Sequence, residues 1–175
     1  METRNWKIDT THSYIGFKIK HMMFTNLKGN FEDYNATITF PEGEFEKASI
    51  QFEAQVASIN TKNIDRDNHL KSADFFDAEQ FPLVTFQSTD IEKKTDSLYI
   101  VKGDLTMHGA TNSITLEAEY SGELKDPWNN TKIALTLTGN IKRKDWGLNW
   151  NSTLETGGVL VSDEVKFEIE TQFSL

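Results

Sequence analysis

Apolar and polar residues alternate one by one along most of this chain. The clearest segments read "IGFKIKHM", "ASIQFEAQVAS", "SITLEAEY", "KIALTLTG" and "EVKFEIETQFSL", and weaker ones read "YNATITF", "LVTFQS" and "LYIVKGDLTM". Successive side chains of a β-strand point to opposite faces, so this period predicts strands with one apolar and one polar face. Such strands must bury their apolar faces, either by closing into a barrel or by pairing two sheets. The pattern predicts an all-β antiparallel fold of about eight strands.

The chain of 175 residues suits one domain spanning residues 1–175, since it shows no repeat of fixed period and no linker. An eight-stranded barrel is just wide enough to be filled by side chains or to hold one slim ligand. Its apolar faces mix large and small residues, as in Phe52 beside Ala54 and Leu116 beside Ala118. Tapered core packing and a ligand cavity both require such a mixture. The alternation alone leaves a filled barrel and a hollow one open.

Charge and composition exclude several functional classes. The net charge of −9 argues against nucleic-acid phosphates and anionic membrane surfaces as partners. The lack of cysteine excludes disulfides, thiolate metal sites and cysteine nucleophiles. No apolar run approaches the roughly 20 residues of a membrane span, and the start "METRNWKIDT" lacks the apolar region of a secretory signal. We therefore expect a cytoplasmic protein, or a periplasmic one if a leader has been removed; the sequence leaves a homodimer open.

The stretch "RDNHLKSADFFDAEQFP" breaks the alternation between two expected strands. It is too long for a hairpin loop, so we expect a short helical segment around residues 64–76 that closes one end of the barrel. Asp65 and Asp67 suit a helix N-terminus, either as caps or as acids of the first turn. The charges could serve as catalytic acids and bases, or Arg66 could hold the cap through salt bridges. The structural interpretation is favoured, because catalysis would need burial and partners that the sequence does not indicate.

Metal ligation is the strongest rival chemistry, and the histidine spacing disfavours it. A catalytic zinc site needs about three protein ligands and an open position. His12 and His21 are nine residues apart, so in one unbroken strand they point to opposite faces. His69 falls in the capping segment and His108 at a turn. Motifs of serine hydrolases, P-loops and dinucleotide-binding folds are also missing from the sequence.

Several blocks, taken in order, resemble a known family. They are "WKIDTTHSYIGFKIKHM", "GNFEDY", "SINT" followed by "RDNHLKSADFFDAEQFPLVTFQS", "VKGDLTMHGATNSITLEAEY" and "RKDWGL". Together they are similar to the YceI-like family of polyisoprenoid-binding proteins, from Trp6 to the C-terminal strand. The resemblance implies a lipocalin-like antiparallel β-barrel with a long apolar lumen. It further implies binding of isoprenoid chains, including isoprenoid quinones or pyrophosphates, or of other amphiphilic lipids, and catalysis is not the usual role of the family. The lack of a leader favours its cytoplasmic branch.

These observations predict a protein that sequesters or transports a polyisoprenoid or a similar long-chain amphiphile and needs no metal or other cofactor. Selectivity would then depend on lumen length and a few polar groups at the rim. Strand parity gives these candidates for the lumen wall: Phe17, Ile19, Phe52, Ala54, Phe86, Leu116, Leu135, Phe167 and Ile169. His21, which shares the inward parity of Phe17 and Ile19, and Arg66 are candidates for the ligand head group. The alternative is an enzyme acting on a small apolar substrate, either a metal-assisted hydrolase or one using Asp67 and His69 as an acid–base pair.

Overall fold

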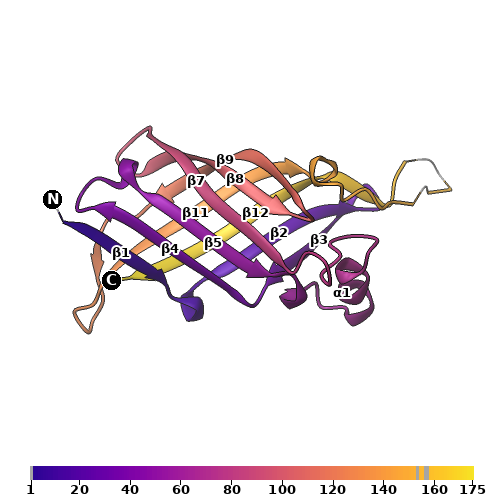
Figure 1. The fold of residues 1–175 in the computed structure, drawn as a ribbon, viewed down its shortest axis with the longest axis horizontal. Coiled ribbons are helices and arrows are strands. Elements are labelled where there is room, and N and C mark those ends of the chain that lie inside the picture. Colours follow the sequence, from indigo (N-terminus) through magenta and orange to yellow (C-terminus); the bar gives the residue numbers. More distant parts are fainter. Residues whose placement is uncertain (1, 153, 156–157) are drawn as a thin grey trace.

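The computed structural model describes residues 2–152, 154–155 and 158–175. It contains a closed antiparallel β-barrel with one short α-helix (Figure 1). The strands are β1 (Thr3–Ile8), β2 (Tyr14–His21), β3 (Thr25–Phe31), β4 (Tyr34–Pro41), β5 (Ser49–Gln55), β6 (Ile59–Asn60), β7 (Leu83–Lys93), β8 (Leu98–Met107), β9 (Ala110–Tyr120), β10 (Leu124–Lys125), β11 (Thr131–Lys142) and β12 (Val161–Ser174). The helix is α1 (Ile64–Lys71), and the 3-10 turns are η1 (Thr10–His12), η2 (Phe45–Lys47), η3 (Val56–Ser58) and η4 (Arg143–Trp146).

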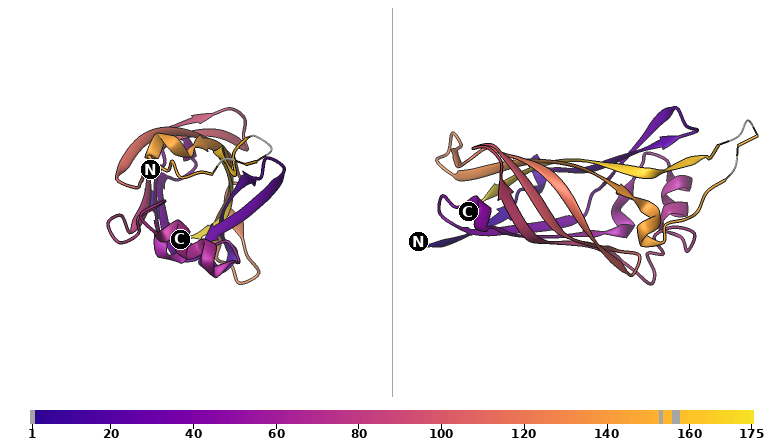
Figure 2. Two further views of the ribbon diagram at one scale, coloured as in Figure 1. Left: turned by 90° about the vertical axis from the view of Figure 1, so that its right-hand side faces the viewer. Right: turned by 90° about the horizontal axis from the view of Figure 1, so that it is seen from above.

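Going round the barrel wall, eight strand positions follow one another, and three of them are each formed by two short strands placed end to end. One edge of β12 pairs with β1 near its C-terminal end and with β2 over the rest of its length. In the same way β3 is continued by β4, and β5 by β6. The other edge of β12 pairs with β11 along most of both strands, and β11 also pairs with β9, so the ring closes (Figure 2). The predicted eight-stranded antiparallel barrel is confirmed.

Aromatic side chains cluster in the core of the barrel. Their cluster includes Trp6 of β1, the strand that begins at the end of the barrel where both chain termini lie (Figure 1). Trp6 stacks on Phe40 with ring centroids 5.9 Å apart, and Phe45 of η2 stacks on Tyr120 at 4.2 Å. Tyr99 meets the edges of Phe45 and Tyr120. Burial raises the pKa of Tyr120 to about 12, as expected for a phenol removed from water. We call these five residues the aromatic plug, since they close this end of the barrel.

The segment between β6 and β7 covers the opposite end (Figure 1). Asn63 caps α1 by accepting a hydrogen bond from the backbone N–H of Arg66 at 3.0 Å, while Asp65 and Asp67 are acids of the first turn. The helix ends at Lys71, earlier than the expected limit near residue 76. Residues 72–81 form turns, in which the N–H of Asp77 bonds the carbonyl of Ser72. The predicted helical cap is thus confirmed in place and is shorter than expected.

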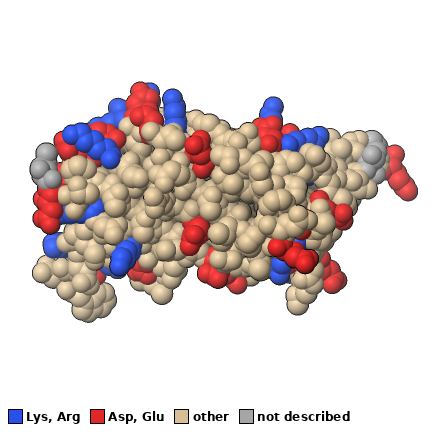
Figure 3. Space-filling model, viewed as in Figure 1, with Lys and Arg blue, Asp and Glu red and all other residues tan. Residues whose placement is uncertain are grey.

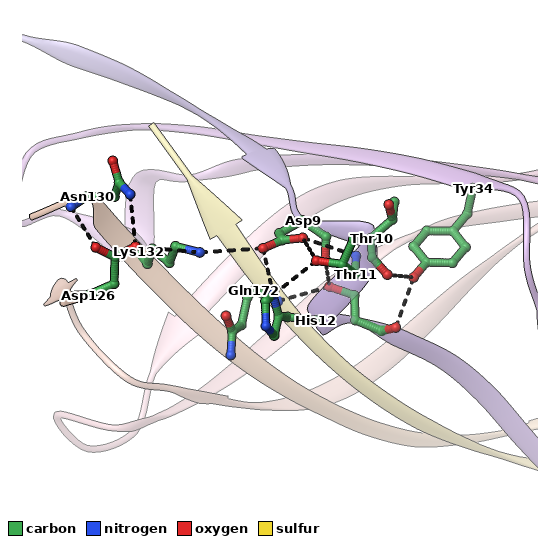
Figure 4. A network of polar contacts seen from close by, with 10 residues as sticks. Asp9, Thr10, Thr11, His12, Tyr34, Asp126, Asn130, Lys132 and Gln172 are labelled. Atoms are coloured by element: carbon green, nitrogen blue, oxygen red, sulfur yellow. Dashed lines mark hydrogen bonds and ion pairs between the residues drawn. The ribbon is translucent and has the colours of Figure 1, made fainter. Parts of the chain in front are cut away.

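A polar network on the barrel wall joins the break between β1 and β2 to β11 (Figure 4). Asp9 caps η1 by accepting hydrogen bonds from the N–H and the hydroxyl of Thr11, and it lies 2.9 Å from Nδ1 of His12. Nζ of Lys132 is 3.4 Å from the carboxylate of Asp9 and 3.9 Å from that of Asp126. The hydrogen bonds of Thr11 and then of His12 hold the pKa of Asp9 well below its ordinary value. This cluster stabilises the strand break; it does not line the barrel interior.

Replacing Asp9 by alanine should therefore cost about 1–2 kcal/mol at neutral pH, the usual cost of a lost helix cap. The pKa of Asp9 is lowered in the folded state, so this stabilisation is present above the unfolded value of 3.8 and lost as the pH falls toward the lowered value. Urea unfolding of both proteins at several pH values measures the difference. A gap between Asp9→Ala and wild type that stays constant down to about pH 2 would contradict this linkage.

Candidate functional site

The barrel encloses an apolar cavity between the aromatic plug and α1. Its volume is about 570 Å³, within the roughly 300–1,000 Å³ that small-molecule sites usually occupy. Inward side chains of β1 to β9, β11 and β12 form its wall, together with residues of α1, of the segment that follows it and of the segment between β11 and β12. A barrel filled throughout by its own side chains, one of the two alternatives from the sequence, is thereby excluded. The cavity has the size and lining of a ligand site.

The structure places ten of the eleven predicted site residues at the cavity wall. They are Phe17, Ile19, His21, Phe52, Arg66, Phe86, Leu116, Leu135, Phe167 and Ile169. Strand parity found nine of these ten, because the strands keep the register that the alternation requires. Arg66 reaches the cavity from α1. Contact of these side chains with a ligand remains a prediction.

Ala54 differs from the expectation. It is buried, with 1% of its surface exposed, yet it is not part of the cavity wall. It pairs across the sheet with Tyr34 and Val84 near the end of β5. The parity of Ala54 was correct, and its assignment to the lumen was wrong.

Arg66 is held at the cavity mouth by Thr61, which lies just before α1. Nε of Arg66 donates to the hydroxyl of Thr61 at 2.8 Å, and Nη2 donates to its carbonyl at 2.6 Å. Asp67 accepts from the N–H and the hydroxyl of the same threonine. Within the described residues the guanidinium group makes no ion pair with a carboxylate, so the salt-bridge interpretation of this segment is corrected. Thr61 fixes the charged group of Arg66 beside the apolar lumen.

His69 forms the second polar group of the mouth. Its Nε2 lies 2.9 Å from the carboxylate of Asp74, and its ring meets Trp150 edge-on with centroids 4.7 Å apart. Phe75 packs against both rings. Asp67 and His69, the acid–base pair of the alternative hypothesis, each bond another residue: Asp67 accepts from Thr61, and His69 lies against Asp74. Asp74, the partner of His69, lies in the turns that follow α1, which ends at Lys71. The sequence pattern did not indicate this end of the helix.

Arg143 is a buried charge that the sequence reasoning missed as a site residue. Nη1 donates to the carbonyls of Leu148 at 2.5 Å and Trp150 at 2.9 Å, while Nε donates to the carbonyl of Ser162 at 2.9 Å. Burial lowers the pKa of Arg143, and the negative charge of Asp163 opposes this effect. The side chain also contributes to the cavity wall. It ties η4, the segment carrying Trp150 and the start of β12 together around the mouth.

The cavity is polar at one end and apolar along the rest of its length. Polar or charged side chains gather near α1 and η4: His21, Asn63, Asp65, Arg66, His69 and Arg143. Further in, Thr171 also lines the wall, but its hydroxyl donates to the carbonyl of Leu135 at 3.0 Å. Aliphatic and phenylalanine side chains form most of the remainder, together with Gly16, Met107 and Trp150. The arrangement suits an amphiphile whose tail lies toward the aromatic plug and whose head lies at the α1 end.

Metal chemistry gains no support from the placement of the histidines. In the described part of the chain, no group of three His, Asp or Glu side chains is arranged to hold a metal ion. His12 belongs to the network on the wall, and Nδ1 of His108 lies 2.9 Å from the carbonyl of Trp146.

Across the residues described, no helix combines the length and apolarity needed to cross a bilayer.

Comparisons with known proteins agree with this architecture. A model of the YceI-like domain matches residues 6–173. A UPF0312 protein of Staphylococcus aureus is 37% identical over 172 residues, which cover 98% of each chain. Among solved structures, a YCEI protein of Campylobacter jejuni is 34% identical over 89% of both chains, with a TM-score of 0.76.

Two more distant structures share the fold. BcnA of Burkholderia cenocepacia is 22% identical, with a TM-score of 0.82, and the match covers 94% of this chain and 98% of that one. A polyisoprenoid binding domain from Saccharophagus degradans, described as implicated in plant cell wall breakdown, is 16% identical over 97% of both chains, with a TM-score of 0.74.

Proposed function

The chain belongs to the family of YceI-like domains, and from that premise we propose that its barrel binds and carries a polyisoprenoid or a similar long-chain amphiphile. The observation that carries this proposal is the cavity of about 570 Å³, apolar along most of its length and with its charged side chains gathered where α1 and η4 meet the barrel. A structure of the same fold is described as a polyisoprenoid binding domain, which supports the same ligand class. Isoprenoid quinones and isoprenyl pyrophosphates both combine such a tail with a compact polar head.

The energetics of the lumen suit a long apolar tail. Each methylene group transferred from water into the cavity contributes about 0.8 kcal/mol, against the cost of immobilising the ligand. Methyl and phenyl groups of the wall provide little directional bonding, so they do not distinguish one saturated or prenyl chain from another. We propose that the cavity length selects the tail, and that Arg66, His69 and His21 contact the head group.

Protein purified without detergent should release an apolar species, in about one copy per chain, on extraction with organic solvent. Mass spectrometry of the extract identifies its tail and head group. Protein stripped of lipid should then bind a fluorescent long-chain probe, and the extracted compound should compete with it. Extracts free of lipid from several preparations, together with no probe binding by stripped and refolded protein, would disprove the proposed function.

A further inference from the structure

The hairpin between β2 and β3 ends in three consecutive exposed apolar residues. Met22, Met23 and Phe24 expose 56%, 64% and 86% of their surfaces. Met22 and Met23 also adopt left-handed backbone conformations, with φ of 52° and 63°. Glycine and asparagine tolerate that conformation much better than methionine. Both the exposure and the conformation disfavour this sequence in a turn surrounded by water, so another environment is expected to stabilise it. We call these three residues the hairpin tip.

The hairpin tip lies next to the polar mouth of the cavity. His21, which directly precedes it, is part of the cavity wall. The N–H of Met22 donates to the carbonyl of Leu160 at 2.8 Å, and Leu160 also lines the cavity. The β2–β3 hairpin projects beyond the barrel wall at this end (Figure 2). Whatever binds the hairpin tip is therefore brought close to the mouth.

The charge of the hairpin is opposite to that of the chain. Residues 14–31 contain Lys18, Lys20 and Lys28 and no Asp or Glu, whereas the whole chain has a net charge of −9. Nζ of Lys20 lies 3.4 Å from the carbonyl of Phe24, so one of these charges lies directly beside the apolar residues. Elsewhere on the face shown in Figure 3, acidic and basic side chains are interspersed. The expectation that the chain avoids anionic membranes rests on its average charge, which does not describe this hairpin.

We propose that the hairpin tip inserts into the interface of a phospholipid bilayer that contains anionic lipid. The apolar side chains would enter the boundary between head groups and acyl chains, and Lys20 and Lys28 would meet lipid phosphates. This inference rests on the proposed function, since a lipid carrier must exchange its ligand with a membrane. Insertion would bring the mouth to the depth at which an amphiphile leaves the bilayer.

A second copy of the chain is a poorer partner for the hairpin tip. A stable protein interface buries roughly 800 Å² on each partner. Large aromatic side chains bury roughly 150–250 Å² each, so three side chains of that size or smaller fall short of this area. A narrow projecting turn with adjacent lysines instead matches the geometry of a membrane-anchoring loop. The charge and the small area both favour the bilayer.

The conformation of the turn provides a variant that removes two of the three apolar residues of the hairpin tip without harming the fold. A double substitution, Met22→Asn with Met23→Gly, places preferred residues at two left-handed positions. A matched control is Trp128→Ser, which removes a side chain that is 80% exposed in the loop between β10 and β11, at the other end of the barrel. Equal urea unfolding midpoints for wild type and the double variant, or a higher midpoint for the variant, establish that the barrel is intact.

Lipid-stripped wild-type protein should sediment with vesicles of phosphatidylcholine mixed with a minority of phosphatidylglycerol. The double variant should partition to them at least about tenfold more weakly, while Trp128→Ser should bind as wild type does. Binding that weakens as salt is added would support the contribution of the lysines. Equal partitioning of wild type and double variant would overturn the proposal. So would a dimer, seen by sedimentation in solution, that only the double variant loses.

Probe binding in solution and binding to vesicles test the proposed function and the membrane docking separately. Both proteins should take up a fluorescent long-chain probe from dilute solution with equal affinity, because the hairpin tip is not part of the cavity wall. Transfer of the same probe from vesicles should be at least about tenfold slower for the double variant. Normal probe binding by wild type without any vesicle binding would refute membrane docking alone. Vesicle binding without probe binding would refute the function and leave the docking surface in place.

Discussion

Replacing Arg143 by leucine is expected to destabilise the protein by about 3–5 kcal/mol, because one buried and two partly buried carbonyl groups lose their donor. The guanidinium group donates to the carbonyls of Leu148, Trp150 and Ser162, all within 2.9 Å. Leucine offers no hydrogen bond, so the carbonyl of Leu148 loses its donor in a buried site and the other two lose theirs in partly buried sites. Relief of the desolvated charge offsets part of this cost and does not reverse it.

Two substitutions serve as matched controls, one at Arg143 itself and one at the neighbouring Lys142. Arg143→Lys keeps the charge but replaces the planar fork with a single ammonium group, which cannot serve three carbonyls in this geometry. It should be destabilised by a smaller amount than Arg143→Leu. Lys142→Leu, at an exposed position of β11, should stay within about 0.5 kcal/mol of wild type.

Urea unfolding of lipid-stripped proteins measures all three variants, since bound ligand would raise the apparent stability. The Arg143→Leu protein should also bind a long-chain probe more weakly, because Trp150 and the start of β12 lose their common attachment at the mouth. A loss of stability below about 1 kcal/mol would contradict this account, because one unpaired buried acceptor alone costs that much.

Strand parity was enough to predict the wall of the lumen but not its extent. Phe17, Ile19 and His21 follow directly from the alternation, because every second side chain of a strand faces the same side. The alternation gives no information on depth along the barrel axis. Ala54 has the correct face and is buried but is not part of the cavity wall, while Ala36 on the adjacent strand lines it and was not selected.

The mouth was harder to predict, because its contacts join segments that are far apart in sequence. His69 meets Trp150 across the barrel end, and Arg143 reaches the carbonyl of Ser162. A charged residue following a strand is normally expected in solvent, so hydrophobicity gave no reason to bury Arg143. The block "RKDWGL" was the one available signal, and it came from resemblance and not from periodicity.

Ala36 lines the cavity and Ala54 does not, so the same substitution at the two positions should have different effects. Ala36→Phe should leave the ligand-free protein nearly as stable as wild type, because the new ring enters the open cavity. If the ring displaces two or three methylene groups of a bound tail, at about 0.8 kcal/mol each, long-chain affinity falls by about tenfold or more. Short chains that do not reach this depth should lose less.

Ala54→Phe is the matched control, since it makes the same change on β5 at a site of similar burial outside the cavity. Ala36 exposes 5% and Ala54 1% of its surface. Because Ala54 is buried and is not part of the cavity wall, the larger ring should strain its surroundings and cost about 1–3 kcal/mol. Affinity for long chains should change little if the folded barrel is retained. Urea unfolding and binding across a series of chain lengths, both on stripped protein, therefore give opposite patterns for the two variants. Equal losses of stability would mean that the lumen at Ala36 is filled, and unchanged long-chain binding by Ala36→Phe would mean that ligands occupy another part of the cavity.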